Sequence, residues 1–247
     1  MACPHTSRLV AAALLGTLVA AGSTQAFAQP PESPAPAPVA GTPWMAIGVD
    51  FLGAAPRGDF SNAASAAYGV NAQFHYHLTP MLRVRVEGGF LEYGRESREV
   101  CLPTCRVLFD MTTTNNIYFG SVGVEVVRPR GSIRPYVNLG LGGSSFQTET
   151  HLEGVDDEDS IGNTTNFDDN TSLVSIGGGV YIPVQRSGGL LTIDLGVRFH
   201  HNDTVRYLRE GDIEDNADGS ISFTPTRSRA NLVAIVAGVT FNIQRRR

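Results

Sequence analysis

The sequence predicts an all-β protein, an eight-stranded antiparallel up-and-down β-barrel that spans a membrane. Three observations predict this fold class: eight segments in which apolar and polar residues alternate, connections that are short and long in turn, and 27 glycines, several of them inside the alternating segments. A period of two residues gives a strand one apolar and one polar face. An even number of strands, with short turns at one end and longer loops at the other, is typical of membrane-spanning barrels.

The predicted strands differ in how clearly they alternate. In residues 68–78 the apolar side chains stand at even numbers, and the other face carries Gly, Asn, Gln and two His. Residues 82–86 alternate Leu or Val with Arg, and residues 122–126 alternate Val with Gly or Glu. Residues 191–200 alternate apolar side chains with Thr, Asp, Gly, Arg and His. Weaker alternation predicts the other four strands, at residues 44–52, 135–146, 172–182 and 231–243.

The connections between these segments alternate in length. Short turns are predicted at residues 78–81, 128–132 and 183–189. Long polar loops are predicted at about residues 53–66, 94–112, 148–170 and 201–229. The barrel must close, because an open sheet edge in hydrocarbon would leave backbone donors and acceptors unpaired.

A secreted sandwich or a lipocalin-type barrel would also alternate, with the opposite face toward water. Three features favour the membrane barrel instead. The loops are asymmetric, the polar faces are rich in small residues, and aromatic residues lie near the ends of apolar faces, as in interface girdles. The small residues are Gly69, Gly123, Gly140, Gly142, Gly177, Gly179 and Gly196, and the aromatic residues are Trp44, Phe74, Tyr76, Phe90, Phe199 and Phe241.

Composition excludes several other classes. The chain has 247 residues, of which 42% are hydrophobic, so it is not disordered. After the N-terminus no apolar run reaches the roughly 20 residues of a spanning helix. The net charge is −5 with no basic block, so no nucleic-acid partner is expected.

The N-terminus predicts export. Residues 1–28 form a predicted signal peptide, with Arg8 before an apolar stretch and cleavage between Ala28 and Gln29. Residues 29–42 form a proline-rich leader in the periplasm, and residues 43–247 form the outer-membrane barrel domain.

Cys101 and Cys105 are the two cysteines of the mature chain, because Cys3 is removed with the signal peptide. In an oxidising compartment we expect them to form a local disulfide in the second long loop. A metal site is the weaker alternative, since two thiolates supply half of a tetrahedral shell.

The inward face of the predicted barrel carries charges of both signs on neighbouring strands. A narrow lumen excludes most water, so these groups are expected to pair. We expect a structural ion network that fills the barrel, and a selectivity filter for small solutes is the alternative. The residues are Asp50, His75, His77, Arg83, Arg85, Glu87, Glu125, Asp194 and Arg198.

Three segments carry a family resemblance: residues 134–142 (RPYVNLGLG), 191–199 (LTIDLGVRF) and 237–243 (AGVTFNI). With them the chain resembles the eight-stranded outer-membrane β-barrel superfamily, which contains the OmpA membrane domain and OmpX-like porin-family proteins, over nearly all of residues 43–243. The resemblance implies a place in the outer membrane of a Gram-negative envelope, contact with outer-membrane lipids and lipopolysaccharide, and insertion by the barrel-assembly machinery. Phe241 would be the final aromatic residue that this machinery reads, although a short basic tail follows it.

The sequence predicts a non-enzymatic protein with a structural or surface ligand-binding role through its long loops. No cofactor, catalytic residue or metal site is predicted, and the oligomeric state is left open. A small-solute pore is one alternative. The other is a lipid-modifying hydrolase, because residues 200–203 (HHND) slightly resemble the His-containing segment of lipid A deacylases without its expected Ser.

Overall fold

The computed structural model describes residues 43–101, 108–154, 157–184, 190–209, 212–215 and 221–244. The predicted signal peptide, its cleavage site at Ala28 and Gln29, and the proline-rich leader lie outside the described residues. The predicted disulfide also lies outside them, since Cys105 and the side chain of Cys101 are not described. No helix in the described ranges is long and apolar enough to cross a membrane.

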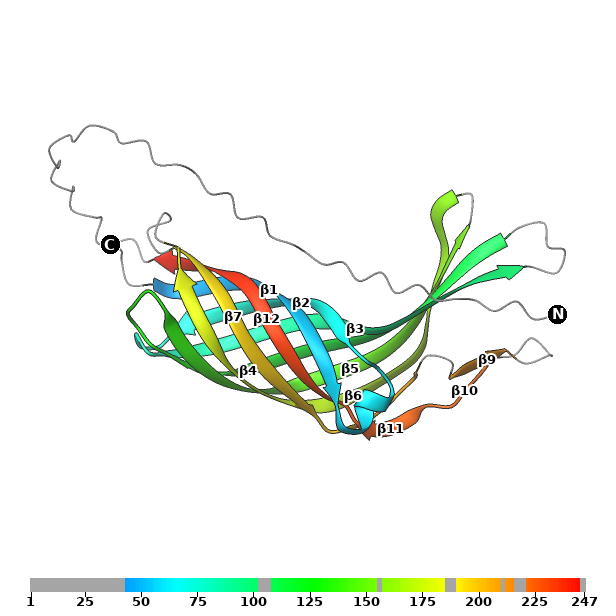
Figure 1. Cartoon of the computed structure of the whole chain (residues 1–247). Coiled ribbons are helices and arrows are strands. Elements are labelled where there is room, and N and C mark those ends of the chain that lie inside the picture. The colour runs from blue at the N-terminus through cyan, green and yellow to red at the C-terminus, as the bar shows by residue number, and fades with distance from the viewer. Residues whose placement is uncertain are drawn as a thin grey trace, which may run out of the picture. The chain divides into compact units, whose positions relative to one another are not determined.

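Eight long strands close into an antiparallel barrel, which confirms the predicted fold class (Figure 1). Around the barrel the order is β1-β12-β7-β6-β5-β4-β3-β2, so each strand neighbours the next barrel strand in the sequence, and β12 closes on β1. Turns join β2 to β3 and β4 to β5, and Gly131 supplies the positive φ of 119° in the second. The barrel strands are β1 (Pro43–Arg57), β2 (Ala67–His77), β3 (Leu82–Cys101), β4 (Leu108–Val127), β5 (Arg134–Gly154), β6 (Asp157–Pro183), β7 (Leu191–Asn202) and β12 (Asn231–Gln244).

The apolar faces of the strands point away from the barrel and the polar faces point into it. On β7, Leu195 and Val197 are 43% and 51% exposed, whereas Asp194 and Arg198 are 0% and 1% exposed. The same holds on β1, where Val49 and Phe51 are exposed and Asp50 is buried. This polarity is the reverse of that in a water-soluble barrel.

Strands β3, β4, β5 and β6 extend far past the barrel, so two of the predicted long loops are largely strand. Pairing of β3 with β4 continues to Cys101 and Leu108, and pairing of β5 with β6 continues to Gly154 and Asp157. The prediction of polar loops at residues 94–112 and 148–170 was therefore wrong. Along these extensions the period-two apolar signal disappears, and β-favouring residues such as Thr112, Thr113 and Thr114 remain to indicate strand.

Parts of the other two long connections fold against the mouth of the barrel (Figure 1). They are the 3-10 helix η1 (Gly58–Asn62), which follows β1, and a small hairpin of the β7–β12 connection, β8 (Thr204–Tyr207) with β11 (Thr226–Arg229). A second hairpin of that connection, β9 (Ile213–Asp215) with β10 (Ile221–Phe223), extends away from the mouth.

An apolar cluster fills this end of the barrel. Its centre is Phe60 of η1, whose ring centroid lies 5.2 Å from that of Tyr93, 6.0 Å from that of Phe146 and 5.0 Å from that of Tyr207. Phe60 and Tyr207 are fully buried although they belong to connections between barrel strands. We call this cluster of Phe60, Tyr93, Phe146 and Tyr207 the aromatic cap.

Glycine at one inward position of β5 permits close approach of β4. A Cβ atom on Gly142 would overlap the backbone oxygen of Gly120. On the adjacent outward position, a Cβ on Gly143 would meet the oxygen of Thr171 at 3.5 Å, an ordinary contact.

We expect Gly142→Ala to destabilise the barrel by about 1–3 kcal/mol, because the two backbones must move apart. Gly143→Ala is the matched control and should cost less than about 1 kcal/mol. Urea unfolding of both variants in detergent micelles measures the difference. Equal midpoints would show that β4 and β5 have room for a side chain at Gly142.

Candidate functional site: the lumen charge network

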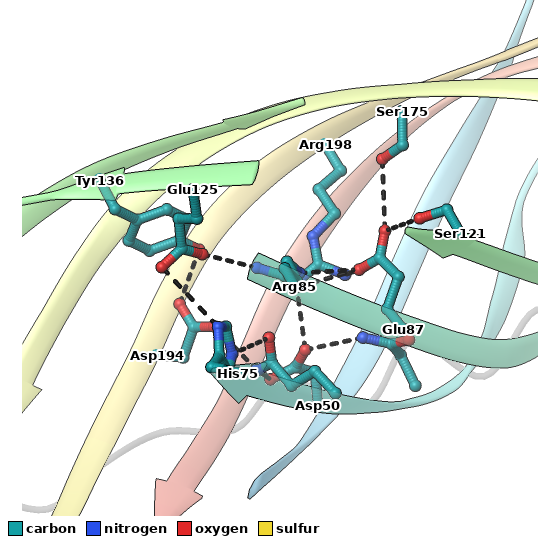
Figure 2. A network of polar contacts seen from close by, with 12 residues as sticks. Asp50, His75, Arg85, Glu87, Ser121, Glu125, Tyr136, Ser175, Asp194 and Arg198 are labelled. Carbon is teal, nitrogen blue, oxygen red and sulfur yellow. Dashed lines mark hydrogen bonds and ion pairs between the residues drawn. The ribbon is translucent and has the colours of Figure 1, made fainter. Parts of the chain in front are cut away.

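A network of buried polar side chains occupies the lumen on the side of the aromatic cap that lies toward the short turns (Figure 2). Nine residues were predicted for the network. Eight of them are buried at inward positions of β1, β2, β3, β4 and β7, and His77 is the exception. His77 lies at the end of β2 and is only half-buried. We use the name lumen network for Asp50, Asn71, Gln73, His75, Arg83, Arg85, Glu87, Ser121, Glu125, Tyr136, Ser175, Tyr181, Asp194 and Arg198.

Arg198 bridges opposite walls of the barrel. Its Nη1 donates to Oε2 of Glu87 at 2.7 Å, and its Nη2 donates to Oδ2 of Asp50 at 3.2 Å. Strands β7 and β3, which carry Arg198 and Glu87, are four positions apart in the closed order of eight, so they face each other across the lumen. The pair therefore braces the barrel across its diameter.

Two further arginines donate to Glu125, and one of them, Arg85, also donates to Glu87. The Nε of Arg85 donates to Glu87 at 3.1 Å, and its Nη1 donates to Glu125 at 3.0 Å. Arg83 also donates to Glu125, and its guanidinium lies 4.7 Å from the ring centroid of Tyr181. Charge-assisted hydrogen bonds of this kind are among the stronger ones, and both carboxylates receive two guanidinium groups.

Asp194 is held by neutral donors. The hydroxyl of Tyr136 donates to its Oδ1 at 2.7 Å, and Nε2 of Gln73 donates to its Oδ2 at 3.2 Å. The same Gln73 nitrogen donates to Asp50 at 2.8 Å. Among the described side chains no cation forms an ion pair with Asp194, so the three arginines face four carboxyl groups. Hydrogen bonds, rather than a counter-charge, stabilise this position.

His75 lies between Gln73, which binds the two aspartates, and Glu125, which binds two arginines. Its Nε2 is 3.1 Å from Oε1 of Gln73, and its Nδ1 is 3.9 Å from Oε1 of Glu125. Its ring packs edge-on against Tyr181. Ser121 and Ser175 donate to Glu87 at 2.9 and 3.4 Å. Members of the network thus come from seven of the eight barrel strands, all but β12.

Side chains thus occupy the lumen at two levels. A solute that entered at the mouth would first meet the aromatic cap and then the ion pairs of the lumen network. The arrangement suits a brace better than a selectivity filter, because its guanidinium groups are committed to carboxylates. The described residues contain no cluster of three or more His, Cys, Asp or Glu side chains that could hold a metal ion.

Two side chains of the HHND segment, those of His200 and Asn202, are buried. His200 is buried in the lumen, its ring centroid is 4.9 Å from that of Phe119, and its Nε2 has no hydrogen-bond partner. Asn202 accepts from the Ser144 hydroxyl at 2.7 Å and donates to a backbone carbonyl. A nucleophile activated by His200 would need a hydrogen bond that this geometry lacks.

Sequence reasoning missed several members of the network. Tyr136 and Tyr181 stack at 4.3 Å between ring centroids and donate to Asp194 and Glu125. Gln73 connects Asp50, Asp194 and His75. Each of these residues stands at an inward position of its strand. The alternation of the strands therefore marks them as lumen residues, although they carry no charge.

Among known proteins, the chain is similar to solved structures of other proteins, and not to a family model or a curated sequence. No protein-family model and no curated protein matches the chain. Ail, the attachment invasion locus protein of Yersinia pestis, is 12% identical with a TM-score of 0.41, and the match covers 80% of this chain and 97% of Ail.

Two further structures match similarly. Neisserial surface protein A is 12% identical with a TM-score of 0.40, covering 81% of this chain and 97% of that one. A major outer membrane protein from Thermus thermophilus is 13% identical with a TM-score of 0.42, and the match covers 80% of this chain and 99% of that one. At these identities and scores the matches carry no argument about function, and the barrel is established by its own strand pairing.

The cross-lumen ion pair predicts a large effect of a single change. Arg198→Gln leaves Glu87 and Asp50 short of a buried cation, so we expect it to destabilise the barrel by about 3–5 kcal/mol. Arg95→Gln is the control: Arg95 pairs with Glu92 but its side chain is 58% exposed, so the loss should be below about 1 kcal/mol. Urea unfolding in micelles measures both. A loss at Arg198 no larger than that at Arg95 would show that the pair does not brace the barrel.

Proposed function

We propose that the protein is a non-enzymatic barrel of the Gram-negative outer membrane, closed to solutes, that acts structurally and presents a projecting sheet to ligands outside the cell. The observation that carries this proposal is the reversed polarity of the barrel. Exposed aliphatic side chains surround it, while ionised side chains are buried inside, and such a surface is stable in hydrocarbon but not in water.

The apolar band has the dimensions of a bilayer core. On β12 it runs from Val233 to Ile243, which matches the 9–11 residues that a tilted strand needs to cross. Exposed aromatic residues lie at both ends of the band, as interface girdles do. Trp44, Tyr76 and Phe241 lie toward the short turns, and Tyr68 and Tyr118 lie toward the projecting strands.

The projecting sheet is formed by the parts of β3, β4, β5 and β6 beyond this band. It lies at the end with the long connections, which is the outer end in barrels of this kind. Pairing of β3 with β2 stops at Glu92, and in the described ranges residues 94–101 pair only with β4. This segment thus lies at the edge of the projecting sheet, and sheet edges are a recurring place for a partner strand to add. This supports a role in binding at the cell surface.

Closure to solutes predicts the electrical behaviour of the protein. Planar bilayers that contain the wild type should carry the same current as protein-free bilayers, because the aromatic cap and the lumen network block the lumen. Insertion is verified by recovering folded protein from the bilayer, recognised by a gel mobility that changes on boiling. Steady single-channel steps would contradict closure and favour a pore.

A charge placed in the apolar band tests the membrane location. Leu139→Arg lies in the band on β5, and we expect it to cost about 2–4 kcal/mol in phospholipid vesicles. Gln147→Arg lies on the same face of β5 but beyond the band, so its cost should stay below about 1 kcal/mol. Urea unfolding in vesicles compares them. Equal costs, or a wild type that is soluble without detergent, would contradict the proposal.

A further inference from the structure

Arginine side chains lie on the outward face of the barrel directly beyond the apolar band, on the side formed by β1, β12 and β7. Arg57 ends β1 and pairs with Asn231 of β12, two residues past the pair of Ala55 and Val233 at the edge of the band. Both are at outward positions, where exposed or half-exposed residues alternate with buried ones. At about 3.3 Å per residue, Arg57 lies roughly 7 Å beyond the band along the strand.

Strand β11 continues this basic face. Ala230, which precedes β12, is fully buried, and Arg229 before it is exposed, so Arg229 keeps the outward phase of Asn231. Arg227 is also exposed, and Ser228 between the two arginines is half-buried. The outward face beyond the band therefore carries Arg57 on β1 and two arginines on β11.

His201 lies on the other side of Asn231. Strands β7 and β12 pair at His200 and Leu232, so the next residues along the two strands are His201 and Asn231. The ring of His201 stacks on that of Phe199, with 6.3 Å between ring centroids, and an imidazole N–H can donate to an oxyanion. We use the name basic rim for Arg57, His201, Arg227, Arg229 and Asn231.

The arginines of the basic rim receive no counter-charge from the protein. Among the described side chains, none of Arg57, Arg227 and Arg229 forms an ion pair. Arg206, which is opposite Arg227 in the hairpin, differs because its Nε lies 3.1 Å from a carboxylate oxygen of Asp169. Three guanidinium groups of the rim are therefore available to an anion outside the protein.

Asp59 and Asp203 are the acids nearest to the basic rim in the sequence. Asp203 accepts a hydrogen bond from the backbone N–H of Thr204 at 2.7 Å. Neither acid forms an ion pair with a rim arginine in the described ranges. Three arginines against two acids leave a positive surplus at this place.

The opposite side of the barrel carries acids at the corresponding position. Its first outward row beyond the aromatic girdle runs across β3 to β6 and contains Glu92, Asn116, Gln147 and Asp168. Arg95 pairs with Glu92, so no surplus of positive charge is left there. Because the whole chain has a net charge of −5, attraction of an anion must be local to the basic rim.

The basic rim lies at the level of lipid headgroups. Barrel strands tilt by about 35–45°, so Arg57 stands roughly 5 Å above the hydrocarbon, and the headgroup region of each leaflet is roughly 5–7 Å thick. Arg229 is two residues further out than Asn231, and its flexible stem lets the guanidinium bend toward the headgroups. This end of the barrel carries the long connections, so the leaflet is the outer one.

We propose that the basic rim binds a phosphate group of lipid A, the lipid of the outer leaflet. Arg57 and Arg229 hold the phosphate, because guanidinium groups bind phosphate oxygens with two parallel hydrogen bonds, and Asn231 and His201 supply neutral N–H donors. The inference rests on the outer-membrane location proposed above. It assigns a lipid partner to a surface that is separate from the projecting sheet.

Native mass spectrometry of the full-length protein in detergent micelles tests the site by titration with lipid A. The wild type should bind one lipid A at least tenfold more tightly than it binds lipid A from which the phosphates have been removed. Arg57→Gln combined with Arg229→Gln should weaken binding of lipid A at least tenfold, since each arginine beside an anionic lipid surface contributes roughly fivefold. Each single variant should weaken binding severalfold.

Arg128→Gln combined with Arg130→Gln is the matched control. It removes the same charge from two exposed arginines of the β4–β5 turn, at the opposite end of the barrel, and should change the affinity less than twofold. Equal losses in the two double variants would indicate diffuse charge attraction and overturn the proposal. A gel mobility that changes on boiling shows that each variant is folded.

Three further results overturn the proposal. Dephosphorylated lipid A that binds as tightly as lipid A would remove the phosphate from the interaction. Phosphatidylglycerol that binds as tightly would remove the selectivity for lipid A, and inorganic phosphate that displaces lipid A at equal concentration would assign the rim to a free anion.

Failure of this inference is distinguishable from failure of the proposed function. A wild type that inserts into phospholipid vesicles in its folded form but does not bind lipid A contradicts the lipid site alone. A wild type that does not insert contradicts the membrane location itself.

Discussion

Pairing of β1 with β12 determines most of what the rest of this protein must do. Once those two strands join, no backbone edge is left in the barrel, and eight strands enclose a lumen only wide enough for side chains. The inward positions must then be filled without overlap and without unpaired charge. Small residues such as Gly142 meet the first requirement, and the lumen network meets the second.

The lumen network follows from this narrow space. Arg198 reaches Glu87 across the barrel because opposite walls are close, and Arg85 connects Glu87 to Glu125 along one side. The network has four carboxylates and three arginines. Asp194 is the carboxylate without an arginine partner among the described side chains, and hydrogen bonds from Tyr136 and Gln73 stabilise it instead. The charges are therefore a consequence of filling a polar interior, and their ion pairs connect its walls.

Beyond the apolar band the constraints change. Strands β3 to β6 continue as a sheet that is not part of the closed cylinder, so residues 94–101 of β3 form one edge of that sheet in the described structure. On the other side of the mouth, η1 and the β8–β11 hairpin fold inward, and Phe60 and Tyr207 close the lumen. The same hairpin directs Arg206 and Arg227 outward. The two sides of the mouth thus differ: one carries a projecting sheet, and the other carries connections that pack over the lumen.

The sequence by itself determined the eight barrel strands, their antiparallel order and the set of charges that share the polar faces, because a half-buried strand must alternate and Asp50, Glu87 and Arg198 stand on the polar phase of that alternation. Only the tertiary structure decided which face is outside, because alternation is the same in either orientation. It also decided that residues 94–101 are strand, since the period-two apolar signal disappears along this extension. The contacts of Phe60 with Tyr207 and of Arg198 with Glu87 join residues far apart in the chain, and barrel closure alone brings them together.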